Sequence, residues 1–170
     1  MELNNNKSAA PTSNAPVPLA SSRKINSQNS ITDKHTSTSA EAKVALLYWV
    51  RIQLEDYIAA NLIPSIQDFS RSWRTGVAFC LLIHRHNPAY IPDLFNTHLA
   101  MDLTEKNTWH QLLRLAFDLG TNKMGIQAYL EPEDLVDVDY PHEPSVMMYV
   151  SEYYKVMSKF QKEEPTNLKR

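Results

Sequence analysis

The amino-acid sequence predicts an all-α fold with four main helices, short connecting helices and a disordered N-terminal leader. Apolar residues recur at spacings of three and four in several segments, as they do on the buried face of a helix. Prolines and glycines separate these segments, and none of them alternates polar and apolar residues as a half-buried strand does. We therefore expect a helical domain over residues 41–160, between a leader at 1–40 and a polar tail at 161–170.

The leader is defined by its composition. Residues 1–40 contain eight Ser, six Asn and four Thr and no aromatic residue. Such a segment buries too little apolar area to offset the entropy lost on ordering, so we expect it to be disordered. A phosphorylation or docking stretch around Arg23 and Lys24 stays open. The chain has neither a basic start followed by an apolar run nor the ~18 apolar residues of a membrane span, so we expect neither secretion nor membrane insertion.

The first predicted helix covers residues 41–59. Ser39 is a candidate N-cap for it, and apolar residues from Val44 to Ile58 follow at mixed spacings of three and four. Residues 61–64 end this helix, because they place an asparagine and a proline close together.

The second predicted helix covers residues 76–86 and is apolar on every side. A helix of this kind is buried rather than placed at the surface, so we expect it to form the centre of the domain. It ends before Asn87, because a residue that precedes proline is driven away from helical backbone angles.

Two further main helices and one short helix complete the predicted domain. A broad apolar stripe predicts a helix over 104–120, and Gly120 is expected to stop it. Residues 129–136 suit a helix of one turn with proline near its start. The last helix is predicted from Pro144 to about Phe160.

Charge and cysteine content exclude several classes of function. Residues 41–160 hold ten basic and fifteen acidic side chains, a net charge of −5, which disfavours nucleic acid and anionic lipid as partners. Cys80 is the single cysteine, so neither an intrachain disulfide nor a CxxC site is available, and a reducing compartment is indicated.

The sequence contains no pattern that indicates catalysis or a bound cofactor. His84 and His86 would point about 200° apart on a helix, so they cannot chelate one metal ion together. The acidic run at 131–139 lacks the glycine and the final glutamate of a calcium loop. No glycine-rich phosphate loop occurs. We expect a protein without metal, cofactor or catalytic residues, and a small hydrolase using His84 or His110 is the weakest alternative.

Three segments carry a family resemblance. They are ALLYW at 45–49, IQDFSRSWRTGVAFCLLIHRHNP at 66–88, and YLEPEDLV at 129–136 followed by PSVMMYV at 144–150. In this order and spacing they resemble the second type of calponin-homology domain, found in the actin-binding regions of spectrin, α-actinin and dystrophin. The resemblance covers about residues 41–158 and implies the calponin-homology fold.

Most residues of these motifs are expected to build the fold. Two tryptophans fill the core, a glycine lets the central helix approach a neighbour, two apolar residues pack that helix and a proline ends it. They are Trp49, Trp73, Gly76, Phe79, Leu82 and Pro88.

The resemblance implies a non-catalytic module of the cytoplasm and cytoskeleton. In tandem members of the family the first-type domain supplies most of the affinity for actin, and the second-type domain stabilises or regulates binding. No first-type domain precedes residue 41 in this sequence, so we expect association with F-actin or another cytoskeletal protein at low intrinsic affinity. The alternative is a protein–protein adaptor without actin contact, serving microtubule, nuclear-envelope or signalling assemblies through the last helix or the leader.

The predicted partner surface uses three cations and two tyrosines. They are Lys43, Arg51, Arg74, Tyr153 and Tyr154. Few cations on an acidic domain predict binding that is weak and sensitive to salt. Of the two tyrosines, one is expected to be exposed on the last helix.

Phosphoinositide binding is not expected. Members similar to α-actinin carry a basic pair after the tryptophan of the first helix. Here Arg51 is the only cation in that stretch, and Glu55 and Asp56 follow it. A phosphate group placed there would meet one cation and two anions, so binding should be weak or absent.

Overall fold

A computed structural model describes the backbone of residues 29–163 and the side chains of residues 39–160. Within this part of the chain every regular element is helical, which confirms the all-α prediction. The elements are α1 (Asn29–Gln53), α2 (Glu55–Ala59), η1 (Arg71–Trp73), α3 (Val77–His86), η2 (Pro88–Tyr90), η3 (Leu94–His98), α4 (Lys106–Met124), α5 (Glu133–Val136) and α6 (Glu143–Glu163). No helix in the described residues combines the length and the apolar character needed to cross a bilayer.

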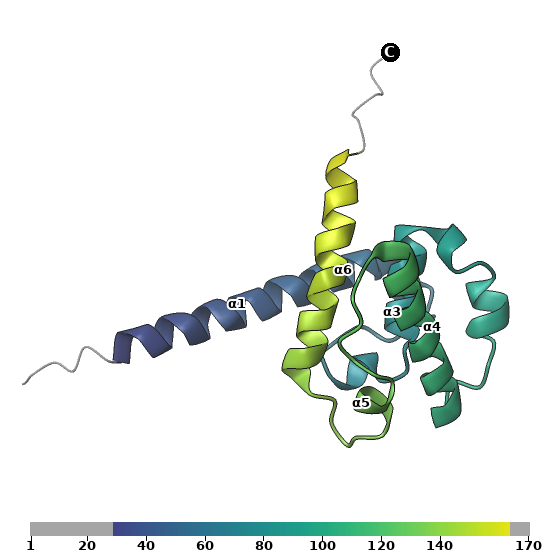
Figure 1. Ribbon diagram of the computed structural model, residues 1–170, viewed down its shortest axis with the longest axis horizontal. Coiled ribbons are helices and arrows are strands. Elements are labelled where there is room, and N and C mark those ends of the chain that lie inside the picture. Colours follow the sequence, from purple (N-terminus) through teal and green to yellow (C-terminus); the bar gives the residue numbers. More distant parts are fainter. Residues whose placement is uncertain (1–28, 164–170) are drawn as a thin grey trace, which may run out of the picture.

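The helices surround α3. This helix packs most extensively against α4, and α1 packs against α6, which crosses it (Figure 1). The amino-terminal part of α1 extends away from the body of the domain (Figure 1). The crossing of α1 and α6 therefore lies at the edge of the compact part of the fold.

The centre of the core is aromatic. Every residue of α3 from Val77 to Ile83 is buried, as expected for a helix that is apolar on all sides. The ring of Phe79 lies 4.6 Å from that of Trp73 and 5.7 Å from that of Tyr153. The indole N–H of Trp73 is satisfied, since it donates to the Asp68 carbonyl oxygen at 2.8 Å. Each ring pair adds about 0.5–1.5 kcal/mol beyond the burial of its area.

Gly76 allows α3 to begin against α4. Its φ of 78° lies in the left-handed region, which side chains rarely adopt. A Cβ atom there would lie 2.8 Å from the Leu113 backbone nitrogen and 3.0 Å from the Leu112 Cβ. Both the backbone angle and the close approach therefore require glycine.

Gly120 does not end its helix, contrary to the sequence prediction. The fourth helix continues to Met124, and Gly125, with φ of 69°, follows it as the left-handed terminator. Gly120 lies inside the helix, where a Cβ would be 2.9 Å from the hydroxyl oxygen of Tyr153. This glycine is required by the packing of α6 on α4.

The first helix also differs from its prediction. It begins at Asn29, within the segment expected to be leader, so Ser39 is a helical residue and not an N-cap. Adding residues to an existing helix costs much less free energy than nucleating a new helix. A segment with too few apolar residues to form a core can therefore still extend α1. Residues 1–28 of the expected leader, and 164–170 of the expected tail, lie outside the described part.

The segment expected as one helix over 41–59 is divided into α1 and α2. The division falls at Leu54, which is fully buried and has φ of −102° and ψ of 6°. The short helix expected within 129–136 is α5, preceded directly by Pro132. The last helix begins one residue before Pro144 and contains the predicted span.

Candidate partner-binding surface

Lys43 lies on α1 where that helix meets the start of α6. Its ammonium nitrogen is 2.7 Å from a carboxylate oxygen of Glu143, and the two side chains are 41% and 39% exposed. An ion pair this accessible to water contributes about 0–1 kcal/mol and is easily exchanged for another partner. Lys43 is therefore available at the surface.

Arg51, on the same helix, is engaged inside the domain. Its Nε donates to the Ile66 carbonyl oxygen at 2.7 Å, and its Nη2 donates to the Gln67 Oε1 at 3.2 Å. These bonds fasten the segment that follows α2 onto α1. Sequence patterns could not reveal this role, because the acceptor lies fifteen residues away in a segment without regular structure.

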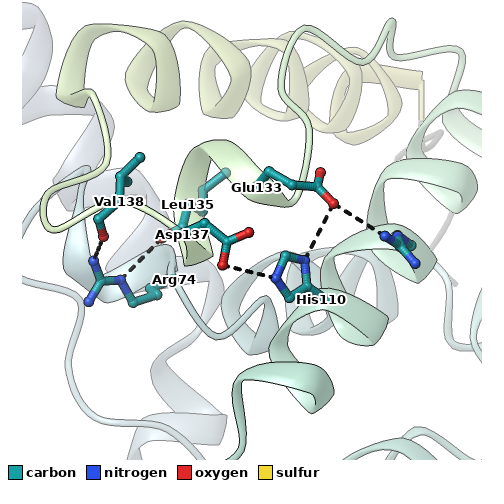
Figure 2. Close-up of polar contacts among 7 residues, drawn as sticks. Arg74, His110, Glu133, Leu135, Asp137 and Val138 are labelled. Carbon is teal, nitrogen blue, oxygen red and sulfur yellow. Dashed lines mark hydrogen bonds and ion pairs between the residues drawn. The ribbon is translucent and has the colours of Figure 1, made fainter.

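Arg74 is committed to the fold in the same way. Its guanidinium donates to the carbonyl oxygens of Leu135, at 3.1 Å, and Val138 (Figure 2). It also donates to the Asp139 carbonyl oxygen, at 2.8 Å. The side chain thus ties the segment after η1 to the end of α5 and the loop beyond it. A side chain with three backbone acceptors has little capacity left for a partner.

His110, from α4, lies between the carboxylates of Glu133 and Asp137 (Figure 2). The His110 Nε2 lies 3.3 Å from Asp137 Oδ1, and its Nδ1 lies 3.7 Å from Glu133 Oε1. The Arg114 Nη2 reaches the same Glu133 oxygen at 3.2 Å. The two carboxylates therefore help to hold α5 and the residue after it against α4.

The two tyrosines predicted for the partner surface have opposite environments. Tyr153 is fully buried, so its predicted place at the surface is wrong, while Tyr154 is 45% exposed. The hydroxyl of Tyr153 lies in the core beside Gly120 without a hydrogen-bond partner, and burial raises its pKa well above the ordinary value. Adjacent helical residues point about 100° apart, and on α6 this places Tyr153 toward the core and Tyr154 toward the surface.

An apolar groove, which we call the α1–α6 groove, accompanies Tyr154 at the surface. It has a volume of about 430 Å³. Its lining residues are Ala42, Ala45, Leu46, Trp49, Met147, Ser151 and Tyr154. The ring of Trp49 stands edge-on to that of Tyr154, with centroids 5.3 Å apart, and its indole nitrogen is buried without an acceptor.

Exposed apolar residues continue along the outer side of α1. Val44 is 67% exposed, Tyr48 66% and Ile52 45%. Their spacing of four places them on one face of the helix. Of the five residues predicted for the partner surface, Lys43 and Tyr154 are therefore exposed, and both lie close to apolar surface residues of α1. The apolar spacing that suggested a buried face for this helix also fits an exposed one.

The residues considered for metal binding or hydrolysis have other partners. The Nδ1 of His84 lies 2.8 Å from the Tyr57 hydroxyl, and burial lowers the pKa of His84. Burial raises the pKa of the Cys80 thiol to about 12, so it is protonated and unreactive in the folded domain. No group of three or more potential metal ligands occurs among the residues that the structure describes.

Three known proteins are similar to this chain over 65–72% of its length. The chain is 39% identical over 123 residues to Alpha-actinin-like protein 1 of Schizosaccharomyces pombe, covering 72% of this chain and 18% of that protein. It is 41% identical over 110 residues to MICAL-like protein 1 of Homo sapiens, covering 65% and 11%. It is 37% identical over 122 residues to the Spectrin beta chain of Drosophila melanogaster, covering 72% and 5%. The chain therefore spans less than a fifth of each relative.

The family match lies over the folded domain. Residues 40–159 match the calponin homology (CH) domain family. This range contains the buried α3, the aromatic cluster around Phe79 and the helices that pack on them. The match covers well over half of the chain, so the chain belongs to the calponin homology domain family.

Proposed function

We propose that this chain is a non-catalytic cytoskeletal binding module that associates with actin filaments at low intrinsic affinity, in the cytoplasm. Membership of the family supports the cytoskeletal role, and the similar proteins include an alpha-actinin-like protein and a spectrin chain. The low affinity rests on one observation. Arg51 and Arg74 donate to backbone carbonyls within the domain, which leaves Lys43 as the available cation among the three predicted.

The proposed contact is electrostatic and therefore weak. Filamentous actin is acidic, and the described domain carries more acidic than basic groups. A small number of exposed cations then steers association, and salt screens it over a distance of about 10 Å at 0.1 M ionic strength. The module should be a modest filament binder whose affinity falls as the salt concentration rises.

Co-sedimentation of the full chain with F-actin, at low and at physiological salt, tests the proposal. We expect pelleting that saturates with filament concentration and weakens as salt increases. Absence of pelleting at low salt would contradict filament binding and leave the family assignment intact.

A pair of charge-reversal variants locates the contact. Lys43→Glu should abolish most of the pelleting, because it reverses the charge of the one cation that is available among Lys43, Arg51 and Arg74 and leaves the fold almost unchanged. Lys155→Glu is the matched control, since Lys155 is also an exposed lysine paired with a glutamate, Glu152, at 2.6 Å. Equal loss in the two variants would show a nonspecific charge effect and would contradict the assignment to Lys43.

The second candidate function is a protein–protein adaptor without filament contact. The α1–α6 groove and the exposed face formed by Val44, Tyr48 and Ile52 favour it, because exposed apolar patches mark interaction sites. For such an adaptor neither lysine variant would alter any filament association, and binding to its partner would depend little on salt. The salt dependence of binding therefore separates the two functions.

A further inference from the structure

The α1–α6 groove has the chemistry of a surface that binds extended, proline-containing peptide. Its walls are the aromatic side chains of Trp49 and Tyr154, and alanines of α1 form much of the rest. The hydroxyl of Ser151 is engaged, since it donates to the Met148 carbonyl oxygen at 2.6 Å. Aromatic-lined apolar grooves of this kind suit the polyproline II conformation, which presents ring and aliphatic side chains without demanding backbone partners.

The groove also contains an unused hydrogen-bond donor. The indole N–H of Trp49 has no acceptor and is covered in this conformation, next to the half-exposed ring of Tyr154. A buried donor without a partner costs about 1–3 kcal/mol. If the Tyr154 ring rotated away, a peptide carbonyl could accept a hydrogen bond from the Trp49 indole N–H. This hydrogen bond would recover part of that free energy.

The chain itself contains a matching peptide. Residues 15–20 read Ala-Pro-Val-Pro-Leu-Ala, a run without polar or charged side chains in an otherwise polar leader. Pro16 and Pro18 fix φ near the polyproline II value and remove two backbone donors that an apolar groove could not satisfy. The segment can therefore be buried in an apolar groove without forming a helix or a sheet.

The length of the intervening chain brings this stretch to the groove. Residues 21–28 can span at most about 26–29 Å when extended. Along α1, Ala42 lies about 20 Å and Trp49 about 30 Å from the helix start at Asn29, at 1.5 Å per residue. Because α1 runs back from Asn29 toward the domain, a leader running antiparallel to it reaches the Ala42 end of the groove.

We propose that the α1–α6 groove binds residues 15–20 of the same chain in the polyproline II conformation. The stretch is about 19 Å long in that conformation, enough to extend from Ala42 past Trp49. This intramolecular contact covers Tyr154 and the apolar part of the surface.

Paramagnetic relaxation in the full chain tests the contact. A nitroxide is attached through Ser13→Cys, and the protonated, buried Cys80 is left unlabelled. We expect the Trp49 indole N–H and the Ala45 amide to lose most of their signal intensity. The indole N–H of Trp109, which donates to Leu103 outside the groove, is the internal comparison and should keep its intensity.

Two pairs of variants make the result specific. In the labelled chain, Pro16→Ser with Pro18→Ser should restore the Trp49 signal without altering the folded domain. Ala45→Glu places a charge on the exposed lining of the groove and should also restore it, whereas Ala59→Glu, at an exposed position of α2, should not. Full Trp49 intensity in the labelled parent chain, or broadening that persists in the double proline variant, would overturn the proposal.

A mixing experiment distinguishes one chain from two. Isotope-labelled chain without the nitroxide is mixed with unlabelled chain that carries it. Intramolecular docking predicts sharp Trp49 signals in this mixture. Broadening there would mean that the leader of a second copy occupies the groove, which overturns the assignment to the same chain. None of these readouts involves actin, so the outcome is independent of the proposed filament binding.

Discussion

At the scale of single residues, hydrogen-bond geometry decides which side chains are available for function. Arg51 and Lys43 lie on the same helix and carry the same charge, yet one donates to a backbone carbonyl and the other to an exposed carboxylate. Removing the first would leave a carbonyl unsatisfied, while removing the second would cost little. The charge of a residue is visible in the sequence, but the identity of its acceptor is not.

Gly120 provides a test of packing at one atom. Gly120→Ala gains about 1 kcal/mol of helix propensity but places a methyl group against the Tyr153 hydroxyl. The crowding should cost about 1–3 kcal/mol, because Tyr153 is fully buried and cannot move aside. We expect a net loss of about 1 kcal/mol in the free energy of unfolding, measured by urea denaturation.

Removing the hydroxyl provides the control for this prediction. In a Tyr153→Phe background, Gly120→Ala should no longer be destabilising, since the nearest remaining atoms, the Tyr149 hydroxyl oxygen at 3.4 Å and the residue 153 ring carbon at 3.6 Å, are at ordinary van der Waals distances. A loss of stability equal in both backgrounds would show that the hydroxyl is not the source of the strain.

His84 gives the domain a predictable pH dependence. Burial lowers its pKa below the ordinary value of 6.5, so the unfolded chain binds protons more readily than the folded chain. The contribution of neutral His84 to stability is complete above pH 6.5 and decreases as the pH falls through the folded pKa. Urea midpoints should therefore decrease from about pH 7.5 to about pH 5.5.

The slope of this dependence is the informative quantity. His84→Gln should flatten it, whatever its effect on stability at neutral pH. His142→Gln is the matched control, since His142 is exposed and its Nδ1 is hydrogen-bonded to the nearby Ser145 hydroxyl at 2.8 Å. A slope unchanged by His84→Gln would contradict the assignment.

At the scale of elements, the short α5 is stabilised more by side chains of other segments than by hydrogen bonds within its single turn. A helix of one turn is unstable alone, and here Arg74 holds the backbone after it while His110 and Arg114 hold its acidic side chains. These contacts join segments 19–65 residues apart in the chain. The region from α5 to the start of α6 is therefore organised by long-range polar contacts.

Arg74→Lys should loosen this region. A lysine cannot reproduce the fork that reaches Leu135, Val138 and Asp139, so we expect a loss of about 1–3 kcal/mol in urea denaturation. Hydrogen exchange should accelerate most in the backbone amides of 135–139. Arg114→Lys, at a 65% exposed position, should change stability by less than about 1 kcal/mol. Equal effects of the two variants would contradict the special role of Arg74.

The elements show where sequence reasoning succeeds. Periodicity and proline placement predicted α3, α5 and α6, because local sterics and apolar spacing determine them. The end of α4 was predicted at Gly120 but lies at Met124. The sequence does not distinguish a glycine that ends a helix from one that makes room for a neighbouring helix, as Gly120 does for Tyr153 of α6. The break at Leu54 and the burial of Tyr153 likewise depend on how helices cross, for which the sequence has no local signal.

At the scale of the whole molecule, the negative net charge of the domain disfavours anionic partners. Residues 41–160 carry a net charge of −5, and their cations are distributed over several helices. Arg51 is engaged with Ile66, and Asp56 is paired with Arg85 at 3.0 Å. In residues 49–57, the stretch where phosphoinositide binding is not expected, Arg51 is the only cation, and it is already bonded within the domain.

Liposome sedimentation tests the consequence for membranes. We expect the full chain to remain in solution both with vesicles that contain phosphatidylinositol bisphosphate and with neutral vesicles, because the acidic domain repels an anionic surface. Tight binding that depends on the headgroup, and that disappears in Arg51→Gln but not in Lys155→Gln, would contradict this prediction.

The buried position of Cys80 allows thiol modification to report on the opening of the domain. The Cys80 sulfur lies 3.6 Å from the Leu112 carbonyl oxygen, at the contact between α3 and α4, and is fully buried. A thiol reagent can reach it only after those two helices separate. The rate of its modification should therefore measure how often the centre of the domain opens, and a ligand that binds only the closed form should slow that rate in proportion to its occupancy.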